Sequence, residues 1–118
     1  MQFSKKGNIY KIIRITGSQD NILGVVFDDE DRSDNDIEVI EWLFPNRYIK
    51  EDKRRASKEE VLKQVLSGLE SVNKSLLTNY KLSKIYFSPL DLSTNGVYSA
   101  LIAVLIRHYH SGNEFKET

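Results

Sequence analysis

The hydrophobic residues of this chain follow one spacing up to Phe44 and a different one beyond Ser57. In the first region, β-branched and aromatic side chains come in short runs, separated by turn-forming Gly, Ser, Asn and Asp residues. Such runs predict strands. In the second region, apolar side chains recur every three or four positions over long stretches, which predicts amphipathic helices. The pattern therefore predicts a chain that begins with strands and continues mainly with helices.

Three strands are expected before Pro45. The first runs from Asn8 to Thr16 and the second from Ile22 to Phe27, and the turn-forming residues 17–21 between them favour an antiparallel hairpin. The second strand is apolar on both faces, which is typical of a strand inside a sheet. A third strand is expected from Ile37 to Phe44, because Pro45 cannot donate a hydrogen bond to continue the ladder.

A long helix is predicted from Ser57 to about Tyr80. Ser57 and Glu60 have the spacing of a capping box, in which each side chain bonds the backbone N–H of the other residue. Gly68 lies inside this helix and is its weak point, because glycine has a low helix propensity. Apolar residues keep helical spacing throughout: Val61, Leu62, Val65, Leu66, Leu69, Val72, Leu76, Leu77 and Tyr80.

A fourth strand is expected from Lys84 to Phe87, ended by Pro89. This strand lies between two helices along the chain, so it is able to pair in parallel as well as in antiparallel fashion. The pattern by itself leaves both pairings open.

A second helix is predicted to run to about His110, with Thr94 or Asn95 as its N-cap. It is apolar almost all round, as helices buried in a core or an interface are, and it therefore also allows a homodimer. Gly112 is well placed to end the helix. The tail from Asn113 onward is expected to be loose.

These elements follow one another in the order β-β-β-α-β-α. We therefore expect an α+β fold: a mainly antiparallel sheet of about four strands with two helices packed on one face. The chain has 118 residues, which suits a single globular domain, residues 1–118, with its own core.

Composition places the chain among ordinary globular proteins. It is 40% hydrophobic and 29% charged, and neither value suggests disorder. The absence of cysteine excludes disulfides and thiolate metal sites and suits a reducing compartment. No apolar run is long enough to span a bilayer, and the N-terminus lacks the apolar core of a signal peptide. The expectation is a soluble cytoplasmic protein without a membrane partner.

The formal net charge is zero, but negative charge is concentrated in residues 28–41, which carry eight acidic residues and one basic residue. Carboxylates this close repel one another, so a fold without a use for them would be more stable with fewer. A plain solvated loop explains the segment almost as well as a docking patch for a basic partner, and the docking patch is preferred. The expected partner-binding residues are Asp28, Asp29, Glu30, Asp31, Asp34, Asp36 and Glu38, with Trp42 or Tyr48 as an apolar anchor.

The same segment partly matches a calcium loop. Asp29, Asp31 and Ser33 resemble its opening, but its sixth position should be Gly and is Asp34, and its twelfth should be Glu and is Ile40. No metal or cofactor is therefore expected, although a metal- or ligand-binding regulatory domain stays as an alternative.

His108 and His110 are the chain's two histidines. Residues two apart on a helix point in different directions, so this pair is not suited to one metal, and packing near the helix end is the preferred interpretation. A small hydrolase or nuclease that uses these histidines as general acid and base stays as an alternative. Phosphate-binding glycine loops and the GxSxG motif are absent, so no catalytic residue is assigned and an enzyme is not expected.

The basic residues between Arg47 and Lys58 are interpreted as a solvated loop. Nucleic-acid-binding domains are usually basic overall and offer stacking aromatic residues, whereas this chain is neutral. No nucleic-acid partner is therefore expected.

Three features together resemble a known family. They are a small cysteine-free α+β chain with an acidic loop, the passage from Ile85 to Tyr98, and the C-terminal stretch from Leu105 to Glu117. In these respects the chain is similar to contact-dependent growth inhibition (CdiI-type) immunity proteins. The resemblance implies binding and neutralisation of one cognate toxin C-terminal domain in the bacterial cytoplasm. Many such toxins are nucleases, whose basic grooves suit a cluster of carboxylates. The family offers no shared binding motif, so the acidic residues are assigned on charge.

Overall fold

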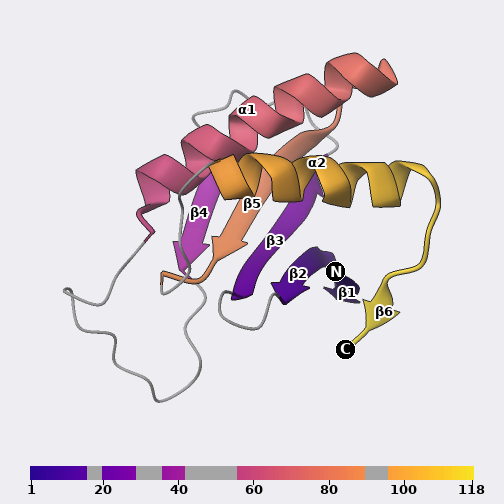
Figure 1. Ribbon diagram of the computed structural model, residues 1–118, viewed down its shortest axis with the longest axis horizontal. Helices are drawn as coiled ribbons and strands as arrows, with labels where there is room; N and C mark the ends of the chain where they lie inside the picture. Colours follow the sequence, from indigo (N-terminus) through magenta and orange to yellow (C-terminus); the bar gives the residue numbers. More distant parts are fainter. Residues whose placement is uncertain (16–19, 29–35, 42–55, 90–95) are drawn as a thin grey trace.

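A six-stranded mixed sheet with two helices across one face makes up the described part of the chain (Figure 1). The computed structural model describes residues 1–15, 20–28, 36–41, 56–89 and 96–118. The elements in chain order are β1 (Gln2–Lys6), β2 (Ile9–Ile15), β3 (Asp20–Asp28), β4 (Glu38–Glu41), α1 (Lys58–Leu76), β5 (Lys81–Phe87), α2 (Val97–His110) and β6 (Lys116–Glu117). The predicted α+β class and the two helices are confirmed.

The sheet has the strand order β4-β5-β3-β2-β1-β6. The pairs β1–β2, β2–β3 and β3–β5 are antiparallel, whereas β4–β5 and β1–β6 are parallel. The predicted hairpin of β2 and β3 and the interior place of β3 are therefore confirmed. The predicted four strands and the order β-β-β-α-β-α are only partly right, because β1 and β6 were missed and two of the pairings are parallel.

Strand β1 was missed because its sequence has a single strongly apolar residue, Phe3. It joins β2 through the two-residue turn Gly7-Asn8, which brings Lys6 opposite Ile9, and Gly7 has φ +60°. Glycine and asparagine are the residues that two-residue hairpin turns favour, so this turn was the available signal.

Strand β5 begins three residues earlier than expected. An irregularity in its pairing with β3 interrupts the alternation of buried and exposed residues by which a strand is recognised in a sequence. Phe27 lies opposite Leu82 and Val26 lies opposite Lys84, which leaves Ser83 as an extra residue. This bulge puts Leu82 on the same side of the sheet as Ile85, and both side chains are buried.

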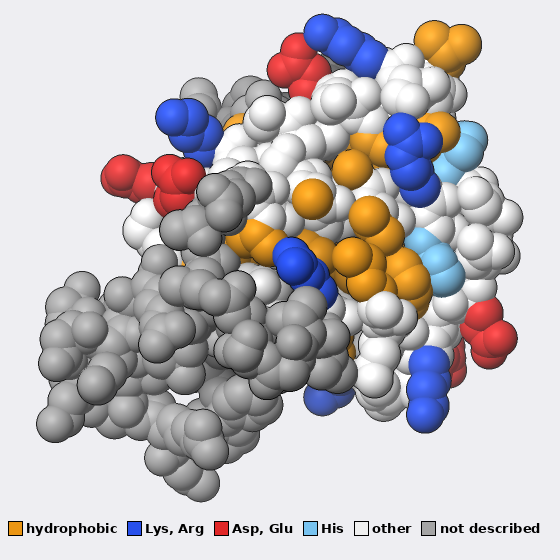
Figure 2. Space-filling view, in the orientation of Figure 1, with side chains coloured by type: hydrophobic (Ala, Val, Ile, Leu, Met, Phe, Trp, Pro, Cys, Tyr) orange, Lys and Arg blue, Asp and Glu red, His pale blue; other side chains and the backbone are white. Residues whose placement is uncertain are grey.

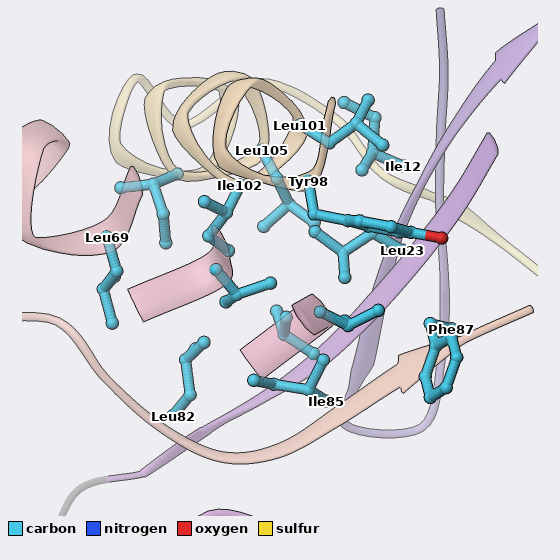
Figure 3. Close-up of a cluster of buried hydrophobic side chains, with 14 of the residues drawn as sticks. Ile12, Leu23, Leu69, Leu82, Ile85, Phe87, Tyr98, Leu101, Ile102 and Leu105 are labelled. Carbon is cyan, nitrogen blue, oxygen red and sulfur yellow. The ribbon is translucent and has the colours of Figure 1, made fainter. Parts of the chain in front are cut away.

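The core lies between the sheet and the two helices (Figure 3). The ring of Tyr98 reaches from α2 toward the sheet among Leu23 and other aliphatic side chains, and it is fully buried. The prediction that α2 is a buried helix is confirmed for most of its apolar residues. The buried core side chains of α2 are Val97, Tyr98, Leu101, Ile102, Leu105 and Ile106. Within the described residues, neither helix combines the length and apolar character that crossing a membrane requires.

Helix α1 begins at the predicted N-cap, Ser57, and the structure has one of the two predicted capping-box bonds. The Ser57 side chain accepts a hydrogen bond of 3.2 Å from the backbone N–H of Glu60. The Glu60 carboxylate accepts a 3.0 Å hydrogen bond from Gln64. The helix ends at Leu76, four residues before the predicted end, because Leu77 takes the left-handed conformation with φ 56°.

Helix α2 is capped from α1. Its N-cap residue is Gly96, which has no side chain to offer, and the predicted caps Thr94 and Asn95 lie outside the described residues. The Gln64 side-chain oxygen accepts a 3.0 Å hydrogen bond from the backbone N–H of Tyr98. Gln64 is buried, so its amide links the two helices in a region without solvent to replace it.

Gly68 lies at a close contact between the two helices, a role that the prediction of a weak point did not include. A Cβ atom at this position would lie 2.3 Å from the Ser99 carbonyl oxygen and 2.6 Å from the Ile102 side chain. Only glycine allows this contact without moving a backbone.

We predict that Gly68→Ala lowers the free energy of unfolding by about 1–3 kcal/mol, because the added methyl group forces the helices apart. The neighbouring exposed substitution Ser67→Ala is the control and should change stability by about 0.5 kcal/mol or less. Urea unfolding followed by circular dichroism measures both. A Gly68→Ala protein as stable as the wild type would contradict the close contact.

Candidate functional site

The acidic segment leaves and re-enters the described structure at one end of the sheet. Asp28 is the last residue of β3 and lies opposite Lys81, the first residue of β5. Glu38 is the first residue of β4 and lies opposite Lys84. Since β5 lies between β3 and β4, both attachment points flank the beginning of β5. We call Asp28, Asp36 and Glu38 the acidic end.

These residues are accessible to a partner to different degrees. Asp36 and Glu38 are exposed, whereas Asp28 is half-buried. The other predicted partner-binding residues lie outside the described part of the chain: Asp29, Glu30, Asp31, Asp34, Trp42 and Tyr48. The structure therefore brings together the first and last carboxylates of the predicted patch and leaves the middle of the patch a prediction.

An open hollow of about 620 Å³ lies next to the acidic end, along the outer flank of α1. Ile37, between Asp36 and Glu38, is part of its lining. The other apolar lining residues come from α1, from the turn after it and from β5: Leu66, Leu69, Leu77, Tyr80 and Leu82. Polar and charged residues share the lining, so the hollow is amphipathic.

The turn between α1 and β5 is held rigidly by Asn73. Its side-chain oxygen accepts hydrogen bonds from the Thr78 hydroxyl at 2.9 Å and from the Tyr80 N–H at 3.0 Å. Its amide nitrogen donates to the Tyr80 carbonyl oxygen at 3.1 Å. This turn places Leu77 at the rim of the hollow, where it is 93% exposed. The sequence pattern had assigned Leu77 to the apolar face of the helix, and that prediction is wrong.

The two histidines point to different neighbours, as expected. The His108 ring stacks on Phe3, with ring centroids 3.6 Å apart, and its Nε2 donates a 2.7 Å hydrogen bond to the Glu114 carbonyl oxygen. His110 Nδ1 shares a 2.7 Å hydrogen bond with the Tyr80 hydroxyl. The histidines lie at one end of the hydrophobic side chains that gather over α2 in Figure 2. Among the described residues, no three His, Asp or Glu side chains group closely enough to hold a metal ion.

The C-terminal tail is docked, contrary to the expectation of a loose tail. Strand β6 pairs with β1, and the Thr118 N–H donates a 3.0 Å hydrogen bond to the Lys5 carbonyl oxygen. The physical reason is Phe115, whose ring packs edge-on against an aromatic cluster: Phe3, Tyr10, His108 and Tyr109. A single aromatic residue in a polar stretch was the only sign of this in the sequence.

A second open hollow, of about 600 Å³, lies beside the docked tail. Lys5 lies at its edge, 3.8 Å from the Glu117 carboxylate and 5.5 Å from the centre of the Tyr10 ring. Glu117 is 80% exposed, so solvent weakens this ion pair.

Lys11 lies on the sheet face away from the helices. By strand alternation Lys11 of β2 is on the face opposite Ile12, which is in the core. Burial lowers the pKa of Lys11, and the nearby charge of Lys6 lowers that pKa further.

Comparison with known proteins matched no family model, no curated protein and no solved structure. The resemblance to immunity proteins therefore stays a prediction, and the case for function depends on the residues described above.

We predict that Phe115→Ala frees the tail and lowers the free energy of unfolding by about 1–2 kcal/mol, because a half-buried ring leaves the aromatic cluster. Hydrogen exchange should show faster exchange at the Thr118 amide. Glu114→Ala is the matched control, since it removes an exposed side chain but keeps the carbonyl group that His108 bonds. Unchanged protection at Thr118 in Phe115→Ala would show that the ring does not hold the tail.

Proposed function

We propose that the chain is an immunity protein that binds and neutralises a cognate bacterial toxin domain in the cytoplasm. The toxin is expected to be a nuclease. The observation that carries the proposal is the acidic end: Asp28, Asp36 and Glu38 flank the start of β5 and are joined through an acid-rich segment. Lys81 and Lys84 lie opposite Asp28 and Glu38, but this end of the sheet and the segment attached to it together still carry more acidic than basic residues.

The charge suits this partner for a physical reason. A nuclease must attract phosphates, so its active-site groove is basic, and carboxylates at an inhibitor's surface are drawn to that groove. Complementary charge raises the association rate and disfavours partners of the wrong charge. Charge alone does not give tight inhibition, because a stable interface buries about 800 Å² on each partner. Trp42 and Tyr48 are the proposed apolar contacts.

The histidine contacts support binding over catalysis. His108 is stacked on a phenylalanine and donates to a backbone carbonyl group, which are contacts that stabilise a fold. His110 bonds Tyr80, whose backbone is in turn bonded by Asn73. Both rings thus have partners within the fold at the end of α2, whereas general acid–base catalysis needs a nitrogen directed at a substrate.

We predict that neutralising the acidic segment weakens toxin binding. Asp28→Asn, Asp29→Asn, Asp31→Asn and Asp34→Asn together should lower the affinity by roughly tenfold or more at low salt, mainly through the association rate, and should flatten its salt dependence. The partner to use is the toxic C-terminal domain of a secreted protein encoded by the neighbouring gene, and surface plasmon resonance measures the rates.

A matched pair of double variants controls for total charge. Asp36→Asn with Glu38→Gln should slow association, whereas Glu59→Gln with Glu114→Gln, which changes the net charge equally at sites away from the acidic end, should not. Equal effects from both pairs would assign the result to net charge. Unchanged affinity and salt dependence in the fourfold variant would refute the acidic-end mechanism.

A further inference from the structure

We propose that the chain also forms a two-fold dimer with a second copy of itself, in which Leu77 of each copy enters the hollow along α1 of the other. This proposal does not depend on the toxin. It rests on the shape, spacing and charges of the outer flank of α1, all within the described residues.

Leu77 is the first observation, because the fold itself gives no reason for a leucine there. Its φ of 56° lies in the left-handed region, where glycine is favoured and a leucine side chain is strained. The side chain is 93% exposed, so it contributes almost nothing to the chain's own core. A contact with another molecule would give this leucine the burial that its own chain does not.

The turn that presents Leu77 is ordered before any contact forms. The three side-chain hydrogen bonds of Asn73, together with the bond from the Thr78 N–H to the Asn73 carbonyl oxygen, fix the backbone on both sides of Leu77. A preordered anchor loses little conformational entropy when it binds, which is what makes exposed apolar residues effective at interfaces.

The hollow is the second observation, because it matches the anchor on the same face. It extends along α1 from Leu66 to the C-cap residue Leu77, which lies eleven positions further along the chain, or about 16 Å at the rise of a helix. Leu66, Glu70 and Asn73 repeat at intervals of four and three residues, so they form one stripe on the helix, and Leu77 follows at the C-terminal end of that helix in the same lining. An antiparallel pairing of two copies brings Leu77 of each to the Leu66 end of the other's hollow.

The charges of α1 fit this pairing. Glu70 of the stripe forms an exposed ion pair of 3.1 Å with Lys74, which lies beside the stripe. When Leu77 lies opposite Leu66 of a second copy, Glu70 lies beside Lys74 of that copy, and the two-fold axis repeats the contact. A two-fold interface must be complementary to itself. This flank offers the exposed Leu77, a hollow, and the oppositely charged Glu70 and Lys74 in the required positions.

The charges of the hollow also distinguish it from the surface proposed for the toxin. The charged residues of the hollow are Glu70, Lys74 and Lys81, so the described lining does not favour a strongly basic partner. The sequence had suggested a dimer through α2, but most apolar residues of that helix are buried in the chain's own core.

Sedimentation equilibrium of the whole chain tests the proposal. Leu77→Asp should weaken the dimer by roughly 10- to 100-fold, because burial of a leucine is lost and a charge enters an apolar contact. Leu77→Gly should give two opposite effects: a dimer weakened to a similar degree, and a folded monomer at least as stable as the wild type in thermal melts at low concentration. If Leu77 only stabilised the monomer, Leu77→Gly would instead lower the stability of the monomer together with dimerisation.

Charge reversal tests the register. Glu70→Lys alone and Lys74→Glu alone should each dimerise more weakly than the wild type, because each brings like charges together across the axis. A mixture of the two variants should form a heterodimer, in which every lysine meets a glutamate. Failure of the mixture to associate better than either variant alone would overturn the antiparallel register.

Ala100→Asp, on the exposed side of α2, is the control for a different interface. It should leave the dimer unchanged. A dimer that is lost in Ala100→Asp but kept in Leu77→Asp would move the interface to α2 and refute the proposal. A wild-type protein that stays monomeric up to about 1 mM would refute it as well.

Discussion

The contact between α1 and α2 at Gly68 is the constraint on which the rest of the structure depends. Because a Cβ atom at this position would lie within 2.3 Å of the Ser99 carbonyl oxygen, the two helices cross at a distance that only glycine permits. Gln64, one turn earlier, bonds both Glu60 and the first turn of α2. These neighbouring contacts fix the two helices as one layer, and that layer covers one face of the sheet (Figure 1).

The position of this layer decides what the sheet presents to other molecules. Helix α1 lies across β4 and β5, so its C-terminal end, the start of β5 and the two attachments of the acidic segment all meet at one end of the sheet. That end combines carboxylates, an amphipathic hollow and an exposed leucine. We propose a basic partner for the acidic end and a second copy of the chain for the flank of α1. The two surfaces are adjacent at Ile37, so one chain is able to use both.

Several of these features were within reach of sequence analysis, and others were not. The N-cap Ser57 and the end of α2 near Gly112 follow from local hydrogen-bonding and backbone preferences, which neighbouring residues determine. The role of Gly68 was missed because it depends on a contact with Ser99, which lies thirty-one residues further along the chain. The docking of Phe115 was missed for the same reason, since its partners come from β1, β2 and α2. The left-handed Leu77 contradicts local preference, and no local rule predicts it.

The sequence alone determined the α+β class, the hairpin of β2 and β3, both helices and the concentration of acid between residues 28 and 41. These depend on spacing and composition, which are properties of short segments. Only the tertiary structure decided that β5 lies between β3 and β4, that the terminal strands β1 and β6 pair in parallel, and that a hollow opens beside an exposed leucine. Those outcomes depend on contacts between residues far apart in the chain, whose energies are settled only when the helices and the sheet pack together.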